Sequence, residues 1–419
     1  MSEKREWSHY EPQLPEVLED PYPAYAWLRD HAPVHYMPRL EAYVLSRYDD
    51  VLAAVRNHAV YSSVGGVGFR PPKAVRERPG LQQNESGGSG ENGLSRTDNP
   101  QHHRIRRLVG SYFETKSIEG FRRRAEMLCD RLLDGVIGRR VNFTEEVAAS
   151  YLPQIMGSWM GISDADLDFV GKGAAASSAV QSGNYNPGEL EKIAAYRAYF
   201  QDMAKQRADD LARGLFTRDK PRDLSDVLFG VTHDGITLNE KEIAANLTIL
   251  ANGGNGNTSH FLSWMIWLFS QRPDLLEAIR AEPASIPAAA EELLRYLATT
   301  QGLCRVTKTP ITVHDTTIPA DTSVLLLYAS GNRDERHYEK PGEIMLDRFP
   351  QGIRSADHLT FSHGIHVCLG NHMARLLIHI MLDRLIKRVR AVELVGPVRK
   401  GANYLVRAIE DVPVFLQPL

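Results

Sequence analysis

A cysteine and three histidines lie close together in the segment FSHGIHVCLGNH, residues 361–372, and all four side chains can bind a metal. Cys368 comes just before a stretch with apolar residues at helical spacing, so we predict that it lies in a loop at a helix N-terminus. Backbone N–H groups and the helix dipole at such a position favour the thiolate over the thiol. Gly364 and Gly370 let a loop fold tightly and approach a large, flat ligand.

Two kinds of metal site agree with this loop. Zinc takes nitrogen and sulfur ligands at short separations, and the loop offers His363, His366, Cys368 and His372. Against zinc, the chain has no Cys-x-x-Cys pair and no second ligand cluster at the usual spacing. The other kind of site is a single axial thiolate on a haem iron. Because an isolated loop cysteine is usually inert, the loop alone does not decide between them.

A second unusual segment is ILANGGNGNTSHFLSW, residues 249–264, inside a long apolar pattern that predicts a helix from Lys241 to Arg272. Its centre contains glycines 253, 254 and 256, interleaved with asparagines. Each glycine costs a helix about 1 kcal/mol relative to alanine. We therefore expect a helix that is opened at its centre for a functional reason, with a kink that only accommodates packing as the alternative.

The loop and three further motifs resemble those of the cytochrome P-450 family, in the family's order and over nearly the whole chain. The family's cysteine-ligand loop runs Phe-x-x-Gly-x-His-x-Cys-x-Gly, and the matching residues are Phe361, Gly364, His366, Cys368 and Gly370. Ser362 departs from the bacterial pattern, which usually has glycine there. The resemblance implies the family's helical fold and haem b as the cofactor, with Cys368 as the axial ligand of the iron.

The resemblance also implies residues that hold the haem propionates. These are His102 and Arg106 in DNPQHHRIRRLV, Arg305 in GLCRVTK, and His366, which would either contact a propionate or close the loop. Arginine and histidine suit this role because they make charge-assisted hydrogen bonds to carboxylates. Without the resemblance, a solvated basic helix face would explain His102 and Arg106 equally well.

The motif EELLR contains the family's Glu-x-x-Arg pair, Glu292 and Arg295. Taken alone, such a pair on a helix surface contributes only a few tenths of a kcal/mol, roughly. The resemblance implies instead a structural ion-pair network, with Arg348 in IMLDRF as its third member.

The family's distal helix carries the pattern Ala/Gly-Gly-x-Asp/Glu-Thr beside the oxygen site, and two registers are open here. In one, Thr258 is the family threonine and Asn257 replaces the acid. In the other, which we favour, Gly253 and Gly254 match the small pair, Gly256 replaces the acid and Asn257 replaces the threonine. An amide is no proton reservoir at neutral pH. Protons would then come through water, a substrate hydroxyl or Thr258.

By resemblance, the substrate wall comprises the loop from Val64 to Phe69, then Leu250, Ala251, Gly302, Leu303, Asn403 and Tyr404. This mainly apolar lining suits a hydrophobic or aromatic molecule of moderate size. We expect a monooxygenase that uses O2 and electrons from a separate ferredoxin or flavodoxin. The alternatives are oxidative coupling, peroxide-dependent oxidation, or a degenerate haem-binding activator partner.

The elements that must position these residues are mainly helices. Apolar spacing predicts helices at Ile193–Arg213 and Lys241–Arg272. Strands are expected at Val34–Tyr36 and Ala42–Leu45 as a hairpin, in DTTIPADTSVLLLYA as a second pair, and in YLVRAIEDVPVFL as part of a small C-terminal sheet. We expect a single mainly α domain over residues 1–419 with small β-sheets. Residues 1–18 should be extended, and residues 80–98, rich in Gly, Ser, Asn and Glu, should form a mobile loop.

Composition excludes several other classes. The net charge of −3 gives no reason to expect nucleic acid as a partner. No run of 18 apolar residues occurs, so we expect no membrane span. The N-terminus shows no apolar signal region, and three cysteines are too few and odd for a disulfide framework. We therefore expect a cytoplasmic monomer.

Overall fold

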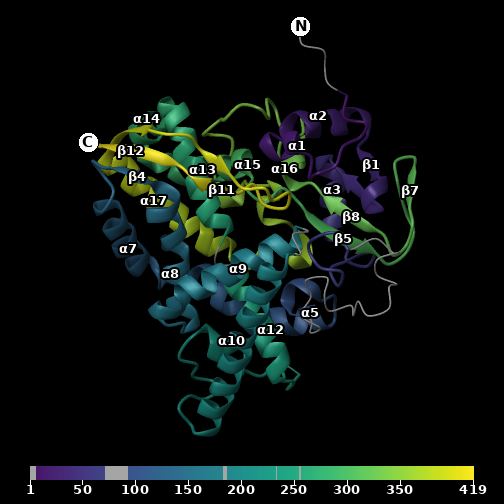
Figure 1. Ribbon diagram of the computed structural model, residues 1–419, viewed down its shortest axis with the longest axis vertical. Coiled ribbons are helices and arrows are strands. Elements are labelled where there is room, and N and C mark those ends of the chain that lie inside the picture. Colours follow the sequence, from purple (N-terminus) through teal and green to yellow (C-terminus); the bar gives the residue numbers. More distant parts are fainter. Residues whose placement is uncertain (1–5, 71–92, 183–185, 233, 254–255) are drawn as a thin grey trace.

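The computed structural model describes residues 6–70, 93–182, 186–232, 234–253 and 256–419. Most of them are helical, as expected (Figure 1). The helices are α1 (Pro15–Glu19), α2 (Tyr22–His31), α3 (Tyr48–Arg56), α5 (Gln101–Gly110), α6 (Thr115–Glu119), α7 (Arg122–Asp134), α8 (Ala149–Met160), α9 (Leu167–Gln181), α10 (Pro187–Ala212), α11 (Leu224–Val227), α12 (Glu240–Gly253), α13 (Asn257–Gln271), α14 (Pro273–Ala281), α15 (Ile286–Leu297), α16 (Tyr328–Gly331) and α17 (Asn371–Arg388).

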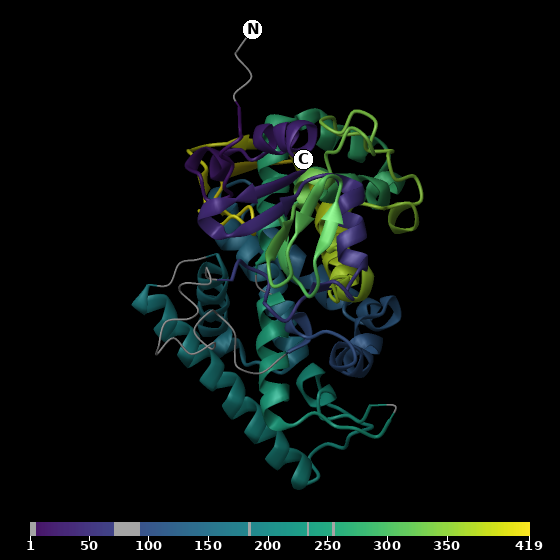
Figure 2. The same cartoon turned by 90° about the vertical axis from the view of Figure 1, so that its right-hand side faces the viewer.

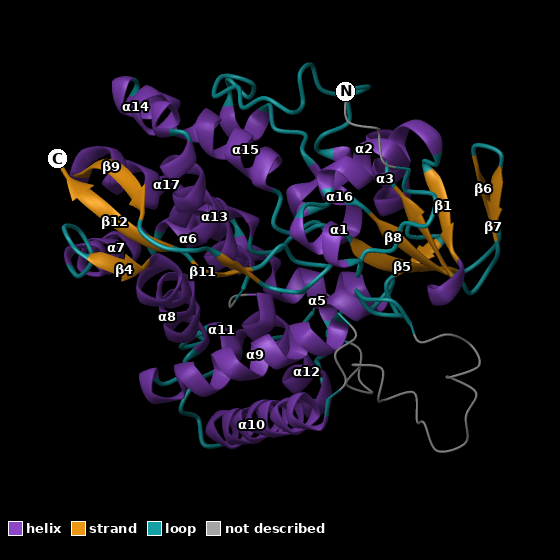
Figure 3. Cartoon of the chain, turned by 45° about the horizontal axis from the view of Figure 1, so that its top comes forward, coloured by secondary structure: helices purple, strands orange, loops and turns teal. Residues whose placement is uncertain are grey.

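The strands are short and form small sheets at two sides of the helices (Figure 3). They are β1 (Val34–Met37), β2 (Ala42–Leu45), β3 (Tyr61–Ser62), β4 (Arg140–Asn142), β5 (Leu303–Thr307), β6 (Ile311–Val313), β7 (Thr316–Ile318), β8 (Ser323–Leu326), β9 (Val389–Leu394), β10 (Arg399–Lys400), β11 (Ile409–Asp411) and β12 (Pro413–Pro418). One sheet has the order β1-β2-β8-β5-β3, and another has the order β4-β12-β9.

Two of the three strand predictions are confirmed. β1 and β2 form the expected antiparallel hairpin, and β12 lies between β4 and β9 in the expected C-terminal sheet. The predicted pairing within DTTIPADTSVLLLYA is wrong, because β7 pairs with β6 whereas β8 pairs with β2 and β5. All four residues of β8 are buried, so this strand needs neighbours on both edges and belongs in the centre of its sheet.

The N-terminal segment is folded rather than extended over residues 6–18, in contrast to the sequence prediction. Trp7 and Tyr10 are buried in a hydrophobic cluster with Leu28 and Met37, and α1 begins at Pro15. Aromatic side chains can remove a large apolar area from water, which favours docking of this segment over extension. Of the predicted mobile loop, residues 80–92 lie outside the described residues, and Leu94–Arg96 form a short helical turn.

The predicted long central helix is interrupted. α12 ends at Gly253 and α13 begins at Asn257 with Gly256 as its N-cap. In Figure 2 the two helices follow one another through the middle of the molecule, with α12 below beside α10.

α10 itself starts six residues before its predicted start at Ile193, because Asn186 caps it by accepting a hydrogen bond from the Glu189 N–H (2.9 Å). Among the helices within the described ranges, none has the length and apolar character needed to cross a membrane.

Candidate functional site

Cys368 lies in a tight loop directly before α17, as its sequence context predicted. We call residues 361–370 the cysteine loop. The Cys368 N–H donates to the Phe361 carbonyl (2.8 Å), and the Asn371 side-chain amide donates to the Cys368 carbonyl (2.7 Å). The Arg375 guanidinium lies over the Phe361 ring, 4.5 Å from its centroid. These contacts fix both ends of the loop against the first turn of α17.

Opposing effects act on the protonation of Cys368. Part of its surface is accessible, yet protein atoms crowd the sulfur, and this desolvation raises the pKa of the Cys368 thiol. The Gly370 amide and the charges of Arg106 and Arg375 act in the opposite direction but do not outweigh it. A metal ion bound to the sulfur would favour the thiolate, because its charge deprotonates a coordinating thiol.

Four predicted propionate donors come together beside the cysteine loop, and we call them the donor cluster: His102, Arg106, Arg305 and His366. The rings of His102 and His366 lie 4.2 Å apart between centroids. Arg106 donates to the Val367 carbonyl (2.8 Å), and Arg305 donates to the Cys304 carbonyl (2.8 Å). α5, β5 and the cysteine loop each contribute to this cluster.

The donor cluster combines two arginines with two buried histidine rings that have unpaired nitrogen atoms. The Nε2 atoms of His102 and His366 are buried without a hydrogen-bond partner in the part of the chain that the structure describes. Burial, together with neighbouring cationic side chains, lowers the pKa of His102 to about 4 and that of His366 to about 3. The nearby carboxylate of Asp98 already accepts hydrogen bonds from Ser62 and the Ser63 N–H. Buried donors without an anion fit a ligand that brings two carboxylates, as haem does.

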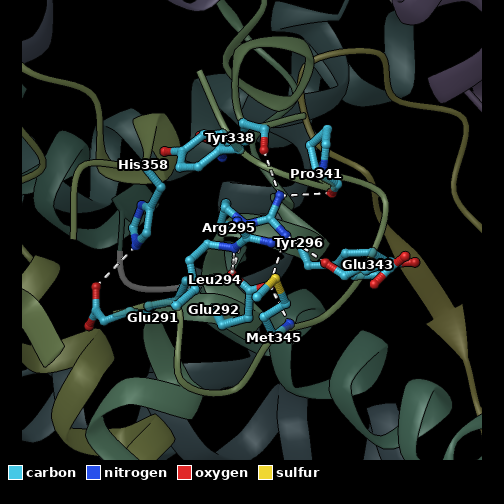
Figure 4. A network of polar contacts seen from close by, with 12 residues as sticks. Glu291, Glu292, Leu294, Arg295, Tyr296, Tyr338, Pro341, Glu343, Met345 and His358 are labelled. Carbon is cyan, nitrogen blue, oxygen red and sulfur yellow. Dashed lines mark hydrogen bonds and ion pairs between the residues drawn. The ribbon is translucent and has the colours of Figure 1, made fainter. Parts of the chain in front are cut away.

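Glu292, Arg295 and Arg348 form the predicted ion-pair network, and Figure 4 shows Glu292 and Arg295 within it. Both Glu292 oxygens accept from Arg295 at 2.8 Å, and Arg348 donates to Glu292 at 3.0 Å. The side chains of Glu292 and Arg295 have no exposed surface. Arg295 also donates to the carbonyls of Asn332 (2.8 Å), Pro341 (2.9 Å) and Glu343 (3.0 Å). The network thus ties α15 to the segment before the cysteine loop.

A second buried network was missed by the sequence analysis. Glu291, next to Glu292, accepts from Arg375 at 2.6 and 2.8 Å and lies 3.0 Å from the His358 Nε2 atom. Arg375 in turn donates to the Asn371 side chain (2.8 Å). The doubled glutamate in EELLR was the available signal, because adjacent helical residues face different neighbours.

The interruption of the distal helix faces open space. Gly253 and Asn257 are exposed, although Leu250, Ala251 and Thr258 around them are buried. A Cβ atom added at Gly253 or Gly256 would meet no described atom within 4 Å. Gly254, which our preferred register places in the small pair, lies outside the described residues. The break is therefore where the sequence predicted it, and the choice of register stays a prediction.

The predicted substrate-wall residues come from several segments that meet only in part. Phe69 stacks on Tyr404 (5.4 Å between centroids), and its N–H donates to the Tyr404 hydroxyl (3.3 Å). Asn403 donates to the Ser178 hydroxyl of α9 (3.0 Å). Val64 is exposed. The remaining members are Leu250 and Ala251, buried on α12, and Gly302 and Leu303 at the start of β5.

Comparisons with known proteins agree with this arrangement. The family described as Cytochrome P450 matches residues 182–287 and 285–396. The chain is 31% identical over 408 residues to Cytochrome P450 130 of Mycobacterium tuberculosis. The aligned region covers 94% of this chain and 95% of that protein. It is 28% identical over 402 residues to Steroid C26-monooxygenase of Mycolicibacterium smegmatis, covering 94% and 92%.

Two solved structures have a similar fold. P450BioI in complex with a hexadec-9Z-enoic acid ligated acyl carrier protein superposes with a TM-score of 0.81 at 25% identity, over 96% of this chain and 100% of that chain. CalO2 superposes with a TM-score of 0.84 at 22% identity, over 98% and 99% of the two chains, and at this identity it supports the fold alone.

Proposed function

The chain belongs to the cytochrome P450 family and is a haem-thiolate monooxygenase, and we propose that it oxidises a hydrophobic or aromatic small molecule and that Cys368 is the residue whose thiolate would hold haem b. The observation that carries the assignment of Cys368 is its place beside the donor cluster. The sulfur ligand lies close to two arginines and to two histidine rings whose Nε2 atoms have no partner among the described residues, as a ligand with an iron and two carboxylates requires.

The protein residues have separate tasks in this proposal. Bound haem supplies the redox chemistry that activates O2. His102, Arg106, Arg305 and His366 hold the propionates, and the cysteine loop presents Cys368. The open space at Gly253 and Gly256 would leave room for a diatomic molecule, with Asn257 or Thr258 as the hydrogen-bonding side chain. One oxygen atom enters the substrate and the other leaves as water, which consumes two electrons and two protons.

The electrons come from an external ferredoxin or flavodoxin in this proposal, and the protein works as a cytoplasmic monomer. The stacked Phe69–Tyr404 pair and the buried apolar residues of α12 support a hydrophobic or aromatic substrate.

The assignment of Cys368 can be tested against the other two cysteines of the chain. The reduced protein with carbon monoxide should show the red-shifted Soret band of thiolate-ligated haem. Cys368→Ala should abolish this band, whereas Cys129→Ala and Cys304→Ala should keep it, because both of these thiols are buried elsewhere in the core. A thiolate spectrum that persists in Cys368→Ala would show that another residue binds the iron.

Peroxide-dependent oxidation or oxidative coupling is a second candidate function on the same scaffold. It is favoured by the distal break, where Gly256 offers no acid in our preferred register. Turnover of a phenolic or hydrophobic compound library would distinguish the two. Product formed with peroxide alone, but not with O2, ferredoxin and reductase, would support the second candidate. Absence of any product with either oxidant would support the haem-binding activator partner.

A further inference from the structure

The two halves of the distal helix pack against different parts of the molecule. α12 packs mainly against α9 and α10, and these three helices lie together at the lower end of Figure 1. α13 packs instead against α8, α14, α15 and β9. The side chains at the end of α12 therefore decide how this half of the helix is held next to the break.

Asn252, one residue before the end of α12, makes two hydrogen bonds outward to α9 and α10. Its side-chain oxygen accepts from the Tyr196 hydroxyl of α10 (3.0 Å), and its side-chain nitrogen donates to the Ser177 hydroxyl of α9 (3.3 Å). The Tyr196 side chain is buried, and burial raises its pKa well above the usual range, so the hydroxyl remains a donor. One side chain thus joins three helices.

α9 also contacts the predicted substrate wall. Ser178, next to Ser177, accepts from Asn403. A Cβ atom on Gly68 would lie 2.1 Å from the Gln181 carbonyl, so the loop from Val64 to Phe69 runs directly against the last turn of α9. A bound molecule that displaces this wall would therefore also displace the part of α9 that carries Ser177.

We propose that Asn252 is a positioning residue that couples α9, and hence the substrate wall, to the end of α12 beside the oxygen site. The role of this coupling in catalysis rests on the proposed function. The hydrogen bonds that form the coupling do not depend on that function. When a bound molecule displaces α9, the Ser177–Asn252 and Tyr196–Asn252 hydrogen bonds carry α12 along. Since a net hydrogen bond corresponds to roughly a fivefold change in an equilibrium, losing one should be measurable.

The chain offers matched controls for both contacts. Ser177→Ala removes one hydrogen bond to Asn252, and Tyr196→Phe removes the other together with a longer contact to the Thr248 carbonyl of α12 (3.5 Å). Ser178→Ala makes the same change one residue further along, where the partner is Asn403. Tyr199→Phe makes the same change on α10, where the hydroxyl donates to Asp166 (3.1 Å).

Hydrogen exchange of the haem-loaded protein tests the contact itself. Ser177→Ala and Tyr196→Phe should each speed exchange of the amides in residues 248–253 by about fivefold, because the C-terminal end of α12 loses an anchor. The two control variants should leave these amides unchanged. Equal acceleration in a test variant and its control, or none in any variant, would overturn the proposal.

The coupling is tested by adding phenylimidazole, whose nitrogen would bind the haem iron and whose phenyl ring would lie toward the predicted substrate wall. In the unmodified protein it should change the exchange of both α9 and α12, whereas in the Ser177→Ala, Tyr196→Phe double variant the response should be confined to α9. A response of α12 that survives in the double variant, or that is absent from the unmodified protein, would overturn the coupling. The Soret shift on binding reports haem ligation separately, so failure of the proposed function would be seen as the loss of that shift.

Discussion

Ser362 holds a backbone conformation that glycine adopts far more readily. Its φ is 58° and its ψ is −176°, a region in which a side chain costs about 1–3 kcal/mol. The Ser362 hydroxyl lies 3.2 Å from the hydroxyl of Tyr328, and both residues are buried. The sequence showed only that a serine replaces the family's usual glycine. The hydrogen bond to a residue 34 positions away explains how the strain is partly offset.

Two substitutions separate strain from hydrogen bonding at Ser362. Ser362→Ala keeps the strain and leaves the Tyr328 hydroxyl without this partner, so the free energy of unfolding should fall by about 1–2 kcal/mol. Ser362→Gly loses the same hydrogen bond but relieves the strain, so it should be more stable than Ser362→Ala by about 1–3 kcal/mol. Urea unfolding of the haem-loaded variants provides the measurement. A glycine variant less stable than the alanine variant would contradict this account.

Asn257 tests the register of the distal motif. If Asn257 takes the place of the family threonine, Asn257→Ala should lower the product formed per electron and release more peroxide, because oxygen loses an orienting partner. Haem binding should persist, since alanine favours the helix. Gly256→Asp with Asn257→Thr should restore the usual pair and raise the yield. An unchanged yield in Asn257→Ala together with a large loss in Thr258→Ala would place the register one residue further along.

At the scale of the elements, the sequence predicted those features that are determined by residues close together in the chain. The β1–β2 hairpin and the positions of α10, α12 and α13 follow from spacing, turn residues and glycines in neighbouring residues. The pairing of β8 with β2 and the docking of Trp7 could not be predicted, because they depend on contacts between segments that are not neighbours in the sequence. The Glu291 network was missed for the same reason, since Arg375 lies 84 residues further along the chain.

The packing of α9 on α10 gives a prediction with a built-in control. A Cβ atom on Gly173 would lie 2.3 Å from the Tyr196 ring, whereas one on Gly171 would meet nothing within 4 Å. Alanine raises helix propensity by about 1 kcal/mol at either site. Gly171→Ala should therefore stabilise the protein slightly, whereas Gly173→Ala should destabilise it by about 1–2 kcal/mol through overpacking. Thermal unfolding would show the opposite signs, and equal effects would mean that α9 shifts freely.

For the whole molecule, the adjacent glutamates of α15 link parts of the chain that are distant in sequence. Glu292 holds the segment around Met345, whose N–H donates to it (2.8 Å), and Glu291 holds α17 through Arg375. Although burial opposes ionisation of Glu291, hydrogen bonds from His358 and Arg375 lower its pKa to about 2, from an ordinary value of 4.5. Because the folded pKa is depressed, the unfolded chain takes up this proton first as the pH falls.

The stability that Glu291 contributes is therefore fully present above about pH 4.5 and is lost as the pH falls toward 2. Near pH 7, Glu291→Gln should lower the free energy of unfolding by about 3 kcal/mol, and this deficit should shrink by about 2 kcal/mol near pH 3, where unmodified Glu291 is losing its advantage. Asp168→Asn is the control, because its ion pair with Lys172 is largely exposed and should contribute about 0–1 kcal/mol at either pH. Urea unfolding at both pH values measures the two deficits. A Glu291→Gln deficit that stays constant with pH would mean that the carboxylate acts through packing alone, and that the ion pairs joining α15 to α17 add no stability of their own.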